Sequence, residues 1–239
     1  EITRQEAWHT RQDTARINIP HFYREIIERA AFEARESEYV DQKSGVSTRL
    51  TITAMEQIVS SAERRAVLNG EDETTIRIVD LYHIVPALTG KLELVYEGEQ
   101  EGALNVAKHI IGKAISKVFK LYFPDPQSRN EEQKKVYTPI TQWFSKGNEV
   151  NLPDTLNSEE YAASLKSVDG LQELVKTRVK PKSESELLAW MDLVLESLHQ
   201  NSMLSKLDND DDSKYADMVG SMFSSFTGLD NEDYNDFDV

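Results

Sequence analysis

Helical periodicity is the feature that most limits the folds open to this chain. Apolar residues recur at every third or fourth position through long stretches, most clearly in residues 103–122. Only 10 glycines and 7 prolines interrupt the 239 residues, and the apolar–polar alternation typical of half-buried strands is nearly absent. The sequence therefore predicts an all-α fold.

Local signals place the ends of these helices. Pro20 suits the first turn of one helix, Asn69-Gly70 ends the next, Pro86 bends or ends the third, and Pro181 separates the last two. Ser47 is one candidate N-cap for the second helix, and a capping box that starts at Thr53 competes with it. We expect helices at about residues 21–34, 48–69, 79–86, 103–122, 159–179 and 184–207.

The best domain boundary in the sequence follows the strongest helix. Pro124-Asp125-Pro126 stops that helix and begins a polar stretch. We therefore expect a lead-in segment at residues 1–19, a helical domain at 20–123, a linker at 124–135, a helical C-terminal extension at 136–207 and an acidic tail at 208–239.

The negative charge is concentrated in that tail. The chain carries a net charge of −15, and residues 208–239 contain ten acidic residues and one basic residue. This composition disfavours nonspecific nucleic-acid binding and predicts a tail that is largely disordered. Met222, Phe223 and Phe226 form an apolar cluster inside it, which is either a partner-docking peptide or part of an ordinary disordered end.

Several classes of protein are disfavoured by residues that the chain lacks. It has no cysteine, which excludes disulfides and thiolate metal sites, and its five histidines are scattered without metal-ligand spacing. No apolar run approaches the length of a membrane span, and no signal-peptide core is present. We expect a cytoplasmic protein without a metal site or membrane segment. Residue 1 is Glu rather than Met, which indicates a fragment or a processed product.

The sequence does not contain a complete set of catalytic motifs. Gly90-Lys91 and Gly112-Lys113 are the only Gly-Lys pairs with apolar flanks, and neither is followed by the Ser or Thr of a phosphate-binding loop. No apolar strand ends in Asp-Glu, and no Gly-x-Ser-x-Gly elbow occurs. The chain alone is expected to be inactive as an enzyme.

One short motif and its surroundings point to a family. Residues 44–49 read Ser-Gly-Val-Ser-Thr-Arg and lead into the second expected helix, which contains Ser-Ser-Ala-Glu-Arg-Arg-Ala at 60–66. Asn-Gly-Glu at 69–71 and Asp80 at the next helix follow. This order resembles the lid of the magnesium-chelatase-like and MoxR-like AAA+ ATPases, in which a Gly-x-Ser-x-Arg motif opens the sensor-2 helix. Residues 86–102 are similar to a segment of bacterial magnesium chelatase-like proteins, so the resemblance covers about residues 17–123.

The resemblance implies a role for three residues. Arg49 would be the sensor-2 arginine that contacts an ATP phosphate, Ser47 would cap its helix, and Gly45 would allow a close turn. A guanidinium suits this task because it makes bidentate, charge-assisted contacts with phosphate. Whether Arg49 serves its own subunit or a neighbour stays open.

The resemblance also implies cofactors and partners. The parent protein would use ATP and Mg, supplied by the missing AAA+ core of the same protein, and this fragment alone would bind neither. A homo-oligomeric ring would couple ATP hydrolysis to remodelling of an unknown protein partner or to metal insertion. The alternative is a helical protein–protein interaction module with no nucleotide role, in which Arg49 is structural.

Other residues have ordinary interpretations. Three lysines should form the solvated face of a helix: Lys113, Lys117 and Lys120. Three aromatic residues should anchor the core: Trp143, Phe144 and Trp190. Three glutamates should lie in an acidic loop that holds no metal: Glu97, Glu99 and Glu101.

Overall fold

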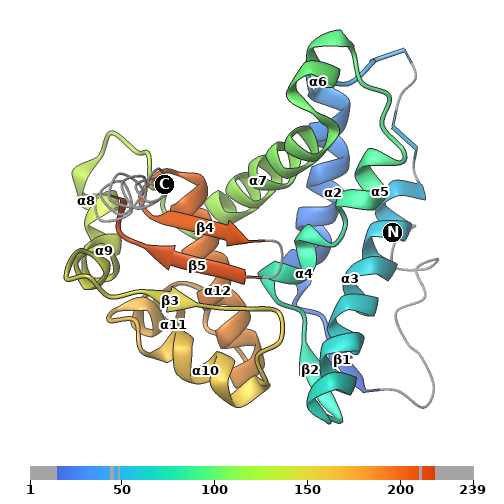
Figure 1. The fold of residues 1–239 in the computed structure, drawn as a ribbon. Coiled ribbons are helices and arrows are strands. Elements are labelled where there is room, and N and C mark those ends of the chain that lie inside the picture. The colour runs from blue at the N-terminus through green and yellow to red at the C-terminus, as the bar shows by residue number, and fades with distance from the viewer. Residues whose placement is uncertain (1–14, 44–45, 48, 210–211, 219–239) are drawn as a thin grey trace, which may run out of the picture.

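The computed structural model describes residues 15–43, 46–47, 49–209 and 212–218. Helices make up most of it (Figure 1). They are α2 (His21–Glu36), α3 (Arg49–Asn69), α4 (Ile78–Tyr82), α5 (Val85–Thr89), α6 (Tyr96–Glu101), α7 (Ala103–Tyr122), α8 (Glu131–Lys134), α9 (Thr138–Ser145), α10 (Ser158–Lys166), α11 (Leu171–Val179) and α12 (Glu184–Gln200), with a 3₁₀ turn, η1 (Lys135–Tyr137). Within the described residues, none of these helices has the length and apolar character needed to cross a bilayer.

The three longest N-terminal helices form where the sequence predicts them. α2 buries a stripe that includes Tyr23, Ile26, Ile27 and Ala30, because these positions share one helical face. α7 packs along α2 and buries Val106, Ile110, Ile111 and Phe119 in the same way. Leu104 and Leu121, which we expected on the buried stripe, are instead 53% and 73% exposed.

The expected helix over residues 159–179 is in fact two helices. α10 ends at Lys166, and α11 begins after Gly170. Gly170 has a φ of +77°, which a residue with a side chain adopts only with strain. A Cβ there would also lie 2.5 Å from the Cβ of Pro139, so this break is tightly packed against α9.

Two small sheets correct the all-α prediction to a mostly helical fold. β1 (Arg16–Asn18) pairs in parallel with β2 (Glu73–Thr75). β3 (Val150–Asn151), β5 (Asp212–Ala216) and β4 (Ser205–Asn209) form an antiparallel sheet in that order. The strands are two to five residues long and rich in charged and polar residues, so they carry little of the alternation that identifies a strand.

The β4–β5 hairpin also corrects the end of the last helix and the start of the acidic tail. α12 ends at Gln200 rather than at Leu207, and Ser202 then adopts a left-handed φ of 55° that turns the chain into β4. Residues 212–216, which we assigned to a largely disordered tail, pair with β4 and bury Tyr215 completely. Figure 1 shows the hairpin lying beside α12.

The hydrophobic core is continuous across the expected domain boundary. Trp190 on α12 packs its ring 4.2 Å from that of Phe22 on α2 and 5.9 Å from that of Phe123. The hydroxyl of Tyr137 donates to the Pro124 carbonyl at 2.5 Å, which ties the segment after α7 back to its end. Residues 20–123 and the helical extension therefore share one core. Trp190 and Phe144 are core anchors, as predicted.

Candidate functional site

Arg49 is the first residue of α3. Its backbone amide donates to the Ser47 hydroxyl at 3.2 Å, and the next amide, of Leu50, donates to the Ser47 carbonyl at 3.0 Å. Ser47 therefore caps the helix, as the sequence suggested. The Arg49 side chain is exposed, and its guanidinium has no ion-pair or hydrogen-bond partner among the described residues.

The other site residues expected from the sequence are not in the described part of the chain. Gly45 lies outside it, as do Met222, Phe223 and Phe226. The structure therefore brings together only Ser47 and Arg49 from the predicted set.

Two polar residues in the middle of α3, Ser61 and Arg65, have a structural role that the sequence motif did not reveal. Arg65 donates to both carboxylate oxygens of Asp80 at 2.7 and 3.0 Å, and Ser61 donates to the same carboxylate at 2.6 Å. The side chains of Arg65 and Asp80 are 2% and 0% exposed. Burial lowers the pKa of Arg65, but the Asp80 charge more than offsets it, so the pKa of Arg65 is raised. This pair joins α3 to α4.

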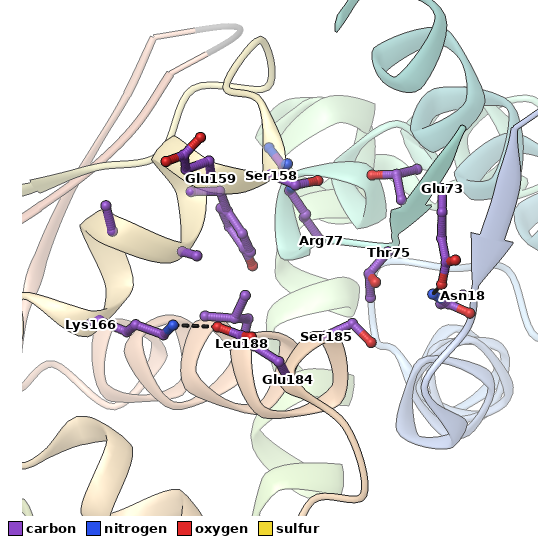
Figure 2. Close-up of a pocket in the computed structure, with 14 residues that line it drawn as sticks. Asn18, Glu73, Thr75, Arg77, Ser158, Glu159, Lys166, Glu184, Ser185 and Leu188 are labelled. Carbon is purple, nitrogen blue, oxygen red and sulfur yellow. Dashed lines mark hydrogen bonds and ion pairs between the residues drawn. The ribbon is translucent and has the colours of Figure 1, made fainter. Parts of the chain in front are cut away.

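A cleft of about 690 Å³ opens near the opposite end of α3 from Arg49. One wall is the β1–β2 pair, the other is α10, and the first turns of α12 close the base (Figure 2). α3 has 21 residues and is therefore about 30 Å long, so the cleft and Arg49 are well separated. The lining includes Asn18, Thr75, Arg77, Tyr161, Ala163 and Leu188.

Arg77 is the most unusual side chain of the cleft wall. It is 2% exposed, its guanidinium lies 4.1 Å from the centre of the Tyr161 ring, and its Nη1 donates to the Leu156 carbonyl at 2.7 Å. Its Nη2 is buried and has no hydrogen-bond partner among the described residues. Burial, with the nearby Arg65 charge, lowers the pKa of Arg77. Leaving such a donor unsatisfied costs about 1–3 kcal/mol.

A short segment before α10 attaches the C-terminal region to α3 at this cleft. Asn69, the last residue of α3, donates to the carbonyls of Thr155 and Leu156 at 3.1 and 3.4 Å. Arg64 pairs with the buried Asp154 at 2.5 Å. Glu71 accepts from the amide and the hydroxyl of Ser158 at 2.6 and 3.0 Å. The cleft therefore sits on the junction between the two halves of the sequence.

Two buried carboxylates lie behind the cleft on α12, one turn apart. Asp192 accepts from the Tyr161 hydroxyl at 2.7 Å and from the Ile78 amide at 2.9 Å. Burial raises the pKa of Asp192 to about 6, although these two donors oppose the rise. The carboxylate therefore links α12 to both α10 and α4.

Glu196 has the opposite electrostatic balance. Its carboxylate accepts from Tyr82 at 2.5 Å, Tyr215 at 2.7 Å and Lys206 at 2.9 Å. Burial alone would raise its pKa, but the Lys206 charge, the nearby His199 and the hydrogen bonds lower it to about 2. Glu196 is therefore the ionised acceptor that holds the β4–β5 hairpin on α12.

Sequence reasoning missed most of this arrangement. Arg77 and Tyr161 belong to distant segments, and no local pattern connects them. Asp192 and Glu196 gave a usable signal, because two carboxylates interrupt an otherwise apolar helical stretch at a spacing of four residues. We did not interpret them as a buried pair.

The described residues contain no group of three or more side chains placed to hold a metal ion. The three glutamates expected in an acidic loop, at 97, 99 and 101, all lie within the short helix α6 instead. Lys117 pairs with Glu33 at 2.6 Å and Lys120 with Asp125 at 3.0 Å, so two of the three lysines of the predicted stripe make partly exposed ion pairs.

Comparison with known proteins adds no further assignment. No protein-family model matches the chain, and neither a curated protein nor a solved structure shows significant similarity to it.

Proposed function

We propose that this chain is the sensor-2 lid and C-terminal extension of an AAA+ ATPase of the magnesium-chelatase-like group. One observation carries the proposal: Arg49 opens a 21-residue helix, is capped by Ser47, and projects an exposed guanidinium with no partner among the described residues. An exposed guanidinium without an internal partner is available to a phosphate supplied from outside this chain.

The chemistry of the proposed role is electrostatic. ATP and Mg would be held by the missing AAA+ core of the same protein, and the metal would neutralise charge on the phosphates. Arg49 would add a second cation where negative charge develops on the transferred phosphoryl group. Its position in the first turn of a long, rigid helix converts phosphate contact into a displacement of the whole lid.

Packing within the fragment supports the mechanical part of the proposal. The Arg65–Asp80 pair fixes α3 to α4, and the contacts of Arg64 and Asn69 fix the far end of α3 to residues 154–156. A movement of α3 would therefore carry the C-terminal region with it. Such coupling would let ATP hydrolysis in a homo-oligomeric ring act on a protein partner or on metal insertion.

The decisive experiment is steady-state ATP turnover by the full-length parent protein carrying Arg49→Ala. Loss of one transition-state contact of this kind lowers turnover about 100- to 1000-fold. Arg49→Lys should restore only part of the rate, because an ammonium group does not reproduce the bidentate fork. Arg129→Ala, at another exposed arginine, is the matched control and should leave the rate unchanged. Wild-type turnover by Arg49→Ala would reject the proposal.

A second experiment tests the assignment of the nucleotide site to the missing core. Calorimetric titration of the isolated chain with ATP and Mg should show only heats of dilution. A saturable micromolar isotherm would mean that the fragment has a nucleotide site of its own, and the lid assignment would fail.

The alternative function is a protein–protein interaction module without a nucleotide role. The observation that favours it is the cleft at the other end of α3, which has the size of a ligand site and contains a buried guanidinium. The two functions are separable, because Arg49 and the cleft can be altered independently.

A further inference from the structure

Four basic side chains mark the end of α11 and the loop that follows it. They stand at alternate positions of the sequence, and all are exposed: Lys176, Arg178, Lys180 and Lys182. Within the part of the chain that the structure describes, none of the four side chains has an ion-pair or hydrogen-bond partner. We call these four residues the basic strip.

Neighbouring carboxylates do not neutralise the basic strip. Glu184 pairs with Lys166, and Glu186 accepts from the backbone amide of Lys182 at 2.8 Å. Glu173 is exposed earlier on α11 and makes no ion pair with the strip. The strip therefore presents uncompensated positive charge on a chain whose net charge is −15.

The dipole of α11 explains only part of this charge. Cations in the last turn of a helix are stabilised by the unsatisfied carbonyls there, which accounts for Lys176 and Arg178. Lys180, with a left-handed φ of 49°, and Lys182 follow the end of the helix and gain less from it. The four like charges repel one another, so an acidic segment that covers them would be held by electrostatic attraction.

The chain carries charge of the opposite sign near its last residue. Residues 230–238 contain no basic side chain and five acidic ones: Asp230, Glu232, Asp233, Asp236 and Asp238. We call this segment, which lies outside the described residues, the acidic end. A free polyanion that approached the strip would be repelled by the net charge of the whole chain, whereas the acidic end is already attached to it.

The connection between the two segments is long enough for them to meet. β5 ends at Ala216 and pairs with β3, which contacts α10, and α10 in turn contacts α11. Figure 1 shows the end of β5 and α11 in the half of the molecule that lies away from α3. Asp230 is twelve residues beyond Met218, so an extended connection spans about 40 Å. α12, which runs through this half, is only about 25 Å long.

We propose that the acidic end folds back on the basic strip of its own chain and covers it. Each exposed ion pair contributes little by itself, but the tether keeps the two segments at a high effective concentration. The strip is then closed to other acidic ligands until the acidic end is displaced. This contact is separate from the proposed nucleotide contact at Arg49 and does not depend on it.

Paramagnetic relaxation NMR on the full 239-residue chain tests the contact. The chain has no cysteine, so Asn235→Cys gives a single position for a nitroxide label. At low salt, the amide signals of residues 176–180 should lose at least about half of their intensity, because the tether favours the closed state. Residues 103–113, in the first half of α7, should keep theirs. Full intensity at residues 176–180 would overturn the proposal.

Salt distinguishes an electrostatic cover from apolar packing of the same segment. At 1 M salt the Debye length falls to about 3 Å, so the loss of intensity at residues 176–180 should disappear. A loss that survives 1 M salt would mean that charge does not hold the acidic end, and the proposal would be wrong.

Charge reversal locates the surface that the acidic end contacts. Lys180→Glu combined with Lys182→Glu should abolish the loss of intensity, because two of the four attracting charges become repelling ones. Lys108→Glu combined with Lys113→Glu changes two lysines of α7 by the same charge and should leave the loss as it is in the wild type. Equal effects of the two double variants would reject the basic strip as the contact surface.

A charge exchange keeps the test valid if the reversed strip disturbs the fold. Adding Asp233→Lys and Asp236→Lys to the reversed strip exchanges the signs of both partners and should restore the loss of intensity. A folding defect would not be repaired in this way. Failure to restore it would mean that the acidic end does not recognise the strip.

A mixed sample separates a contact within one chain from a contact between two copies. Chain that carries only the nitroxide is mixed with isotope-labelled chain that lacks it. We expect residues 176–180 to keep their intensity in this mixture. A loss as large as in the chain that carries both labels would show that the acidic end binds a second copy, and the contact within one chain would be wrong.

Discussion

Arg65 and Asp80 form a bidentate ion pair in which neither side chain exposes more than 2% of its surface. Additional contacts support the pair: Ser61 donates to Asp80, and Nη2 of Arg65 also donates to the Thr75 carbonyl at 2.9 Å. Nε of Arg65 is buried without a hydrogen-bond partner among the described residues. A buried pair is only weak evidence of net stabilisation, because desolvation offsets much of the attraction. Loss of one partner is different, since it leaves the other charge buried and alone.

We therefore predict unequal effects at two adjacent arginines. Arg65→Ala should lower the free energy of unfolding by about 3–5 kcal/mol, because Asp80 is left uncompensated in the core. Arg64→Ala also leaves a buried carboxylate, that of Asp154, without its cation. Because the Arg64 side chain is 56% exposed and water weakens its charge, this loss should be less than about half as large. Urea denaturation followed by circular dichroism measures both. Equal losses for the two variants would contradict the structural role given to the Arg65–Asp80 pair.

A second prediction concerns pH and Asp192. The pKa of this buried carboxyl is about 6 in the folded chain, above its ordinary value of 3.8. The folded state therefore binds the proton more tightly than the unfolded state. The stability that the protonated group contributes is complete below about pH 4 and is lost as the pH rises through 6.

Asp192→Asn should remove this pH dependence, since the amide oxygen still accepts a hydrogen bond and carries no charge. Wild type and variant should be equally stable near pH 4, and the variant should be more stable by roughly 3 kcal/mol at pH 7. Asp125→Asn is the control of opposite sign. Partial burial raises the pKa of Asp125, but the Gln127 amide and Lys120 lower it by more, so the pKa is lowered overall. Removing this carboxylate should therefore destabilise the fold above about pH 4. If the difference in unfolding free energy between the wild type and Asp192→Asn does not grow from pH 4 to pH 7, the pKa assigned to Asp192 is wrong.

The sequence was sufficient to predict the elements whose burial is periodic. α2, α3 and α7 lie within a few residues of the predicted ranges, because their apolar stripes and end signals are local properties of the chain. The N-cap at Ser47 was predictable for the same reason. Leu104 and Leu121, which are exposed, show the limit of this reasoning. Periodicity identifies the apolar face of a helix, but it does not tell how much of that face the neighbouring elements cover.

The remainder depends on contacts between distant segments. β4 and β5 have strand character only because they pair with each other and because Lys206 and Tyr215 reach Glu196 on α12. From local pattern and composition, we had assigned residues 205–207 to the end of the last helix and residues 208–216 to an acidic tail. The cleft depends in the same way on the contact between Arg77 and Tyr161, which no local sequence pattern predicts.

A third prediction tests the β4–β5 hairpin by hydrogen exchange. The amides of residues 205–209 and 212–216 should exchange well below unstructured-peptide rates, because they belong to paired strands that bury Tyr215. Exchange should be measured by mass spectrometry on the full chain under native conditions. Random-coil rates throughout the hairpin would restore the earlier expectation of a tail that is disordered from residue 208.

The last prediction compares two lysines on the hairpin. Lys206 pairs with Glu196 where the two side chains are 1% and 0% exposed, whereas Lys214 pairs with Glu149 where they are 38% and 50% exposed. Lys206→Ala should lower the free energy of unfolding by about 3–5 kcal/mol, because the carboxylate of Glu196 loses its counter-charge inside the core. Lys214→Ala should change it by no more than about 1 kcal/mol, because water already screens that pair.

The pH dependence of the Lys206 variant distinguishes a lost charge pair from a lost packing contact. The pKa of Glu196 is lowered to about 2, below its ordinary value of 4.5, and Lys206 is the largest cause of the lowering. Its contribution to stability is present above about pH 4.5 and is lost as the pH falls toward 2. The destabilisation caused by Lys206→Ala should therefore shrink on acidification through this range, while a packing defect would keep the same magnitude at every pH.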